Sequence, residues 1–163
     1  MPYRIKDRVV IVTGASMGIG RAVALELARE KAKLVLAARS IEKLYQLQIQ
    51  IESLGADCMV APTDMNSPAT IDHLVESTIT RFGGIDILIN NAGFGLWGTF
   101  EKLPMEQIRN IFETNLFGAV HIAKAVIPSM KKRGGGQIIN VESVVALREI
   151  GRASCRERVC QYV

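Results

Sequence analysis

Strand-like and helical patterns alternate five times along the chain, and no hairpin signal interrupts them. Short apolar or β-branched runs suited to buried strands occupy 8–14, 33–39, 57–64, 86–93 and 137–143. Between these runs, apolar residues recur at spacings of three and four, as they do on one face of a helix. This alternation is typical of a doubly wound parallel sheet with helices on both faces. A closed eight-stranded barrel needs about 250 residues, and the chain has 163.

The apolar periodicity also predicts which helical residues are buried. The first helix should begin at Gly18 and bury Ile19, Val23 and Leu27. The third should begin at Pro68, after a Ser67 cap, and bury Ile71, Leu74, Val75, Ile79 and Phe82. The longest helix should run over about 104–133, and its wide apolar stripe predicts that it packs against something further in addition to a sheet face.

Composition places the chain among ordinary globular proteins, with 48% apolar and 22% charged residues and a formal net charge of +4. The one compact basic run, 131–133, follows a helical pattern and suits a helix C-terminus better than a nucleic-acid patch. The three cysteines form no CxxC, and no His cluster accompanies them, so we predict no metal site. No signal peptide and no membrane span is evident, so we expect a cytoplasmic protein without a membrane or nucleic-acid partner.

A glycine-rich turn, TGASMGIGR, follows the first strand at residues 13–21. Such a turn brings backbone N–H groups and a helix N-terminus toward an anion, and its glycines let a phosphate approach closely. A nucleoside-triphosphate loop would need Lys and Ser or Thr after the glycines, whereas Arg21 and Ala22 stand there. A dinucleotide site is therefore favoured. Gly20 is also expected to let the helix lie close to the sheet.

The second strand ends in AARS, residues 37–40, and no carboxylate occurs before Glu42. NAD sites commonly place a carboxylate near this strand end to bind the ribose 2′-hydroxyl. Arg39 can instead pair with a 2′-phosphate through its planar guanidinium. The sequence therefore favours NADP(H), with NAD(H) possible; a solvated arginine at a strand end is the alternative interpretation.

Five motifs in order resemble those of the short-chain dehydrogenase/reductase family over residues 8 to about 147. They are TGASMGIG at 13–20, Asp64 after the third strand, NNAG at 90–93, NLFG at 115–118 and GQIINVES at 136–143. The resemblance implies a Rossmann-like NAD(P)-binding domain over 1–148, without the family's C-terminal strands and helices. It also implies hydride transfer between a nicotinamide and a carbonyl or hydroxyl group.

The resemblance also implies roles for individual residues. The pyrophosphate and adjoining ribose would lie on Gly14, Ser16, Gly18, Ile19 and Gly20. Arg39 would bind the 2′-phosphate, Asp64 and Met65 the adenine, and Asn91, Ala92 and Gly93 would run beside the cofactor. Asn115 and Ser143 would be the catalytic Asn and Ser; a polar helix residue and a strand-end hydroxyl are the plain alternatives. Glu142 departs from the small residue that the family more often has before this serine.

The family's remaining catalytic pair, a Tyr and a Lys in Y-x-x-x-K, is missing from the chain. No Tyr occurs between Ser143 and Tyr162, and no Lys follows Lys132. Residues 149–159, EIGRASCRERV, resemble one reading frame of a common sequencing adapter, so we expect 149–163 to be a non-native tail.

The leading interpretation is the N-terminal part of an NADP(H)-dependent carbonyl reductase or alcohol dehydrogenase, inactive as this chain stands. A non-catalytic dinucleotide-binding module and a non-functional fragment are the alternatives. The substrate would be a small carbonyl compound or alcohol, and the apolar residues of the 94–103 loop hint at an apolar one. The family's helix-mediated assemblies imply a homodimer or homotetramer for the full-length parent.

Overall fold

A five-stranded parallel sheet forms the centre of the molecule. The computed structural model describes residues 5–96, 98 and 100–142. Its strands are β1 (Val9–Thr13), β2 (Lys33–Ala38), β3 (Cys58–Pro62), β4 (Ile87–Asn90) and β5 (Gln137–Asn140). Their order is β3-β2-β1-β4-β5, and every pair is parallel. The prediction of a doubly wound parallel sheet is confirmed.

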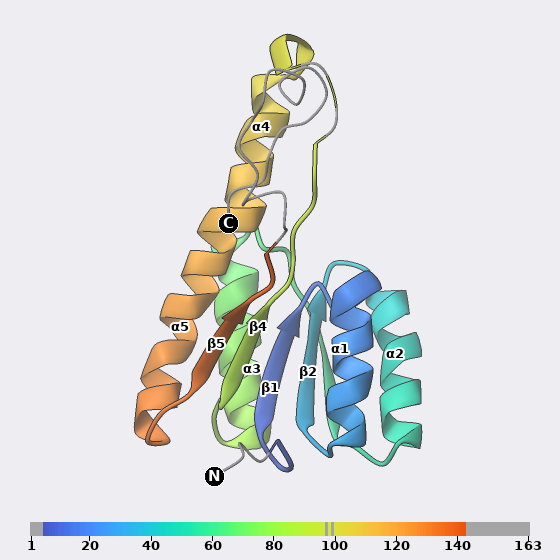
Figure 1. Cartoon of the computed structure of the whole chain (residues 1–163). Helices are drawn as coiled ribbons and strands as arrows, with labels where there is room; N and C mark the ends of the chain where they lie inside the picture. Colours follow the sequence, from blue (N-terminus) through green and yellow to red (C-terminus); the bar gives the residue numbers. More distant parts are fainter. Residues whose placement is uncertain (1–4, 97, 99, 143–163) are drawn as a thin grey trace.

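Helices cover both faces of this sheet (Figure 1). Helices α1 (Gly18–Arg29) and α2 (Ile41–Ser53) pack on one face, where Ala24, Ala28, Leu44, Leu47 and Ile51 meet the side chains of β1, β2 and β4. Helices α3 (Pro68–Phe82) and α5 (Ala119–Lys132) pack on the other face. Because both faces are covered, every residue of β1 is buried, which explains its unbroken apolar run.

The predicted buried face of α1 was wrong in one respect. Ile19 is 62% exposed, and the buried residues of this helix are Gly20, Ala24 and Ala28. A Cβ on Gly20 would lie 2.5 Å from the carbonyl oxygen of Gly14, so the helix approaches the β1–α1 turn as closely as a bare backbone permits. Small residues face the sheet here, and Val23 and Leu27 pack only partly against the core. The expected close approach at Gly20 is confirmed.

Helix α3 begins at Pro68 and ends at Gly83, which is in the left-handed conformation at the C-cap, as the sequence predicts. Ser67 is the N-cap residue, but its side chain makes no capping hydrogen bond, so the predicted Ser67 cap was wrong in that respect. Ile79, however, is 39% exposed, and Thr78 is fully buried in its place. The hydroxyl of Thr78 donates to the carbonyl oxygen of Leu74 over 2.7 Å, which satisfies it inside the core. The apolar periodicity therefore predicted burial of Ile79 wrongly, because the neighbouring Thr78 occupies the core.

The predicted long helix is helical nearly throughout, but it is not one α-helix. It consists of α4 (Met105–Phe112), a π-helical turn η2 (Glu113–Gly118) and α5, and a 3₁₀ turn η1 (Phe100–Lys102) precedes it. A π-helical turn contains an extra residue and is often found at functional sites. The interruption falls on Asn115.

Candidate functional site

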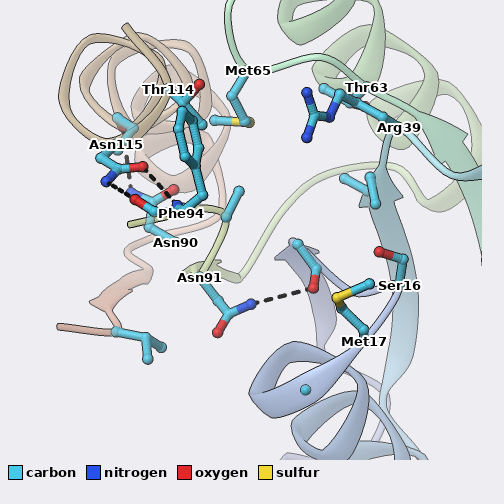
Figure 2. Close-up of a pocket in the computed structure, with 18 of the residues that line it drawn as sticks. Ser16, Met17, Arg39, Thr63, Met65, Asn90, Asn91, Phe94, Thr114 and Asn115 are labelled. Atoms are coloured by element: carbon cyan, nitrogen blue, oxygen red, sulfur yellow. Dashed lines mark hydrogen bonds between the residues drawn. The ribbon is translucent and has the colours of Figure 1, made fainter. Parts of the chain in front are cut away.

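A cleft of about 740 Å³ opens at the carboxyl ends of the strands (Figure 2). It lies where the strand order reverses between β1 and β4, the position at which open α/β sheets bind ligands. Its walls come from every strand end and from η2. The residues that line the cleft come from the strand ends, from the segments that follow the five strands and from η2. They include Gly14, Ser16, Met17, Gly18, Ile19, Arg39, Ser40, Thr63, Asp64, Met65, Asn90, Asn91, Ala92, Gly93, Phe94, Thr114, Asn115, Val141 and Glu142.

The β1–α1 turn presents bare backbone to the cleft. Gly14 and Gly18 have φ of +66° and +56°, a region that residues with a Cβ rarely adopt. No atom lies within 4 Å of the place where a Cβ on Gly18 would stand, so the backbone is open there. Helix α1 begins at this glycine, and no side chain caps its N-terminus. The arrangement suits a phosphate-sized anion.

Thr13 and Asn91 join the ends of β1 and β4 beneath this turn. The buried hydroxyl of Thr13 accepts hydrogen bonds from the backbone N–H groups of Asn91 and Ala92, each with a donor–acceptor distance of 3.0 Å. The amide of Asn91 donates to the carbonyl oxygens of Thr13 and Gly14 over 3.1 and 3.3 Å. Asn91 thereby fixes the floor of the cleft, and its second link to Gly14 holds the glycine turn in place.

Arg39 and Ser40 directly follow β2 and line the cleft there. Figure 2 shows the Arg39 side chain reaching along the cleft opposite Met65. Arg39 is exposed and makes no hydrogen bond or ion pair with the residues that the structure describes. Ser40 is the N-cap of α2, yet its side chain makes no capping hydrogen bond. A guanidinium and a hydroxyl are therefore both available to a ligand at this corner.

Asn115 is held rigidly at the other end of the cleft. It is 3% exposed and lies within η2. Its Oδ1 accepts from the backbone N–H of Phe94 over 3.1 Å, and its Nδ2 donates to the carbonyl oxygen of Phe94 over 2.9 Å (Figure 2). A Cβ on Gly93 would lie only 3.1 Å from that Oδ1. Both ends of the Asn115 amide are thus used to tie η2 to the segment after β4.

Asn90 supplies an unused acceptor beside this end of the cleft. Its Nδ2 donates to Asn140 Oδ1 over 3.1 Å and to the carbonyl oxygen of Ala119 over 3.4 Å. Its Oδ1 is buried and has no partner among the described residues. A buried acceptor without a donor costs about 1–3 kcal/mol, so this atom is suited to a donor on a bound molecule or water.

The structure gathers nearly all the residues that the sequence singled out. Of those in the described ranges, only Gly20 does not line the cleft; it packs beneath the turn against Gly14 and Asn91. Ser143 lies outside the described residues. Thr63, Asn90, Phe94, Thr114 and Val141 were missed as lining residues. Most of them stand within a few residues of a strand end, so the rule that ligands bind at those ends could have found them.

Comparison with known proteins assigns the chain to a family. The family described as short chain dehydrogenase matches residues 8–155. The chain belongs to this family. The chain is similar to the 1,6-dihydroxycyclohexa-2,4-diene-1-carboxylate dehydrogenase of Acinetobacter baylyi, with 40% identity over 150 residues, covering 91% of this chain and 57% of that protein. The chain spans about half the length of the curated relatives that it matches, 51% for the ketoacyl reductase HetN of Nostoc.

Solved short-chain dehydrogenases share this arrangement of strands and helices. The L-sorbose reductase of Gluconobacter frateurii, solved with NADPH and L-sorbose, superposes with a TM-score of 0.86 at 36% identity, covering 90% of this chain and 56% of that chain. A 7α-hydroxysteroid dehydrogenase, solved with NADH and 7-oxo glycochenodeoxycholic acid, gives a TM-score of 0.86 at 32% identity, covering 90% of this chain and 57% of that chain. Family and fold thus agree, while the two nicotinamide cofactors differ between these neighbours.

The described part of the chain contains no helix long and apolar enough to cross a membrane. Within the same residues, no group of three or more His, Cys, Asp or Glu side chains is placed to hold a metal ion.

Proposed function

We propose that the cleft binds NADP(H) and that the protein is a carbonyl reductase or alcohol dehydrogenase. When bound, the nicotinamide would supply or accept the hydride. The residues present suit such a molecule. Gly18 leaves the backbone open at the N-terminus of α1, and Gly14 lines the cleft beside it. Asp64 and Met65 line the cleft at the end of β3. Ser16, Ile19, Asn91, Ala92 and Gly93 would line the rest of its path.

Arg39 is the observation that carries the preference for NADP(H). Its guanidinium is exposed in the cleft and unpaired among the described residues, and the neighbouring Ser40 hydroxyl is not used as a cap. The planar guanidinium of an arginine can donate two parallel hydrogen bonds to a phosphate. A hydrogen bond to a charged group contributes about 1.5–3 kcal/mol of interaction free energy. NAD(H) lacks the 2′-phosphate and therefore cannot form the charge-assisted hydrogen bonds that Arg39 would make with it.

Calorimetric titration of the chain with NADPH and NADH tests this preference. We expect NADPH to bind at least about tenfold more tightly, because 1.4 kcal/mol corresponds to a factor of ten. Arg39→Gln should weaken NADPH by about 10–100-fold and leave NADH nearly unchanged. Arg29→Gln, at the opposite end of α1, is the control. Equal affinities for the two cofactors in the unmutated chain would exclude the proposal.

For catalysis we propose that Ser143 holds the substrate oxygen and that Asn115 orders a water for proton relay. The proton donor in this family is a Tyr whose pKa is lowered by a neighbouring Lys, and neither follows Ser143 at the required spacing. The chain as given is therefore proposed to be inactive, and 149–163 to be foreign to the native domain.

Sequencing the source gene beyond codon 148 decides between the enzyme and a non-catalytic binding module. A Y-x-x-x-K soon after Ser143, together with NADPH-dependent carbonyl reduction by the complete protein, would support the enzyme. The same arginine-rich residues followed by a stop codon would favour the binding module.

We further propose that the complete protein is a homodimer or homotetramer assembled through the α4–α5 helices. Phe112 at the end of α4, Phe117 in the η2 turn between the two helices and Val120 in α5 are 44–55% exposed. Light scattering on the complete protein tests this, with Phe117→Lys expected to shift the mass toward the monomer and Ile49→Lys, exposed on α2, expected to leave it unchanged.

A further inference from the structure

The β3–α3 turn is joined to the helical segment that carries Asn115 through one side chain. Asn66 Nδ2 donates to Asn110 Oδ1 on α4, and Thr114 Oγ1 in η2 donates to Asn66 Oδ1 over 2.6 Å. The backbone N–H of Asn66 donates to Asp64 Oδ1 over 3.0 Å, which fixes the turn itself. Both ends of the Asn66 amide therefore bond residues one helical turn apart, 44 and 48 positions along the chain.

The two segments also meet through their backbones. A Cβ on Gly118, the last residue of η2, would overlap the carbonyl oxygen of Met65 and lie 3.0 Å from the Met65 side chain. Met65 itself is 7% exposed. Since no space separates them, a shift of the turn that contains Asp64 and Met65 must be accompanied by a shift of η2.

The π-helical turn η2 depends on contacts with side chains from other elements. A π-helical turn has poorer intrinsic stability than an α-helix and persists where its surroundings hold it. Asn115 follows Thr114 directly and is tied to Phe94 at both ends of its amide. Thr114 itself lines the cleft. The position of Asn115 therefore depends on how η2 is seated, and Asn66 bonds the neighbouring residue.

We propose that Asn66 is a positioning residue that sets η2, and with it Asn115, relative to the turn carrying Asp64 and Met65. The inference rests on the proposed function, because it treats these two groups as binding the nicotinamide and adenine ends of one dinucleotide. Asn66 does not line the cleft and acts only through Thr114 and Asn110. This role has a specific consequence. Substitution of Asn66 should lower the affinity for a ligand that spans both ends of the cleft and leave the affinity for a ligand confined to the adenine end nearly unchanged.

Hydrogen exchange of the nucleotide-free chain tests the seating of η2. Asn66→Ala should accelerate amide exchange over 113–118 by about 3–10-fold, because a hydrogen bond contributes about 0.5–1.5 kcal/mol. Exchange in α1 should not change. The matched control is Gln48→Ala, an exposed amide that donates to Glu52 within α2 and joins no two segments. Unchanged exchange over 113–118 in Asn66→Ala would overturn the proposal.

Nucleotide affinity separates positioning from simple stabilisation. Asn66→Ala should weaken NADPH by about 3–10-fold and 2′,5′-ADP, which carries only the adenine end, by less than about twofold. Thr114→Val should weaken NADPH similarly, and the double variant should be no weaker than either single variant. Equal weakening of both nucleotides, or additive single effects, would refute the role. If neither nucleotide bound the unmutated chain, the proposed function would fail, and exchange over 113–118 would still decide the seating of η2.

Discussion

Gly14 and Asn91 are packed so closely that a methyl group on Gly14 would have no space. The Asn91 amide donates to the carbonyl oxygen of Gly14 over 3.3 Å, and a Cβ on Gly14 would lie 2.8 Å from that nitrogen and 2.9 Å from the Cα of Ala92. The glycine turn therefore rests on the segment after β4 rather than projecting freely into the cleft. The shape of the cleft at this point depends on two backbone segments nearly 80 residues apart.

Gly14→Ala should therefore destabilise the fold and abolish the proposed nucleotide binding. The left-handed conformation alone costs about 1–2 kcal/mol for a residue with a Cβ, and the clash with Asn91 and Ala92 raises the total to about 3 kcal/mol or more. Urea unfolding measures this loss. Gly83→Ala is the matched control, since Gly83 has φ of +78° but no atom within 4 Å of its Cβ position. Equal losses in the two variants would show that the contact with Asn91 contributes nothing.

Thr13→Val should cost about 2–4 kcal/mol of unfolding free energy although the side chain keeps its shape. The Thr13 hydroxyl accepts from two backbone N–H groups and donates to the carbonyl oxygen of Ile89 over 3.3 Å. Valine leaves these buried or half-buried groups without partners, at about 1–3 kcal/mol for a buried one. Thr13→Ser retains the hydroxyl and should stay within about 1 kcal/mol of the unmutated chain. A Val variant as stable as the Ser variant would contradict this account.

The sequence predicted the location of Gly14, Gly18 and Asn91 in the cleft because each lies in a local motif at a strand end. The carboxyl ends of parallel strands meet at one edge of the sheet, so knowing the strands is enough to bring such residues together. Their roles toward a cofactor remain proposals.

Features that depend on contacts between distant segments could not be predicted. Ile19 fits an apolar period, yet the face of α1 that packs on the sheet is the one with small residues, Gly20, Ala24 and Ala28. The π-helical turn has no sequence pattern of its own here. It coincides with contacts to Phe94, Met65 and Asn66, residues far away in the chain. Helical periodicity describes one helix at a time, whereas the buried face of α1 and the position of the π-helical turn depend on contacts with other elements.

Acid should weaken the fold partly through Asp86, which directly precedes β4. Its carboxylate is 1% exposed, accepts from Val9 N–H over 2.8 Å and pairs with Arg8 and Arg133 over 3.0 Å. Burial alone would raise the pKa of Asp86, but the hydrogen bonds from Val9, Arg133 and Arg8 together bring the pKa below its ordinary value. Because the folded state lowers this pKa, the stabilisation is complete above the ordinary pKa of about 3.9 and is lost as the pH falls further.

Asp86→Asn should therefore lose about 3 kcal/mol of unfolding free energy at pH 7, and the difference from the unmutated chain should shrink below about pH 4. Urea unfolding at a series of pH values measures it. Asp72→Asn is the control, because Asp72 is 56% exposed and pairs only with His121 among the described residues; its effect should stay below about 1 kcal/mol. A pH-independent difference for Asp86→Asn would show that the carboxylate's charge is not what stabilises the sheet.

The Cys58 thiol should resist alkylation in the folded chain. Cys58 opens β3 and is 6% exposed in the core between the sheet and α2. Burial raises the pKa of this thiol to about 12, and the charges of Glu52 and Asp57 add to the shift. Since the thiolate is the reactive species and an ordinary cysteine has a pKa of about 8.5, its reaction with N-ethylmaleimide at pH 7.5 should be slower by about three orders of magnitude. Mass spectrometry of the peptide containing Cys58 follows the labelling, and the same peptide in concentrated urea should react within minutes. Rapid labelling under native conditions would show that β3 opens far more readily than its packing implies.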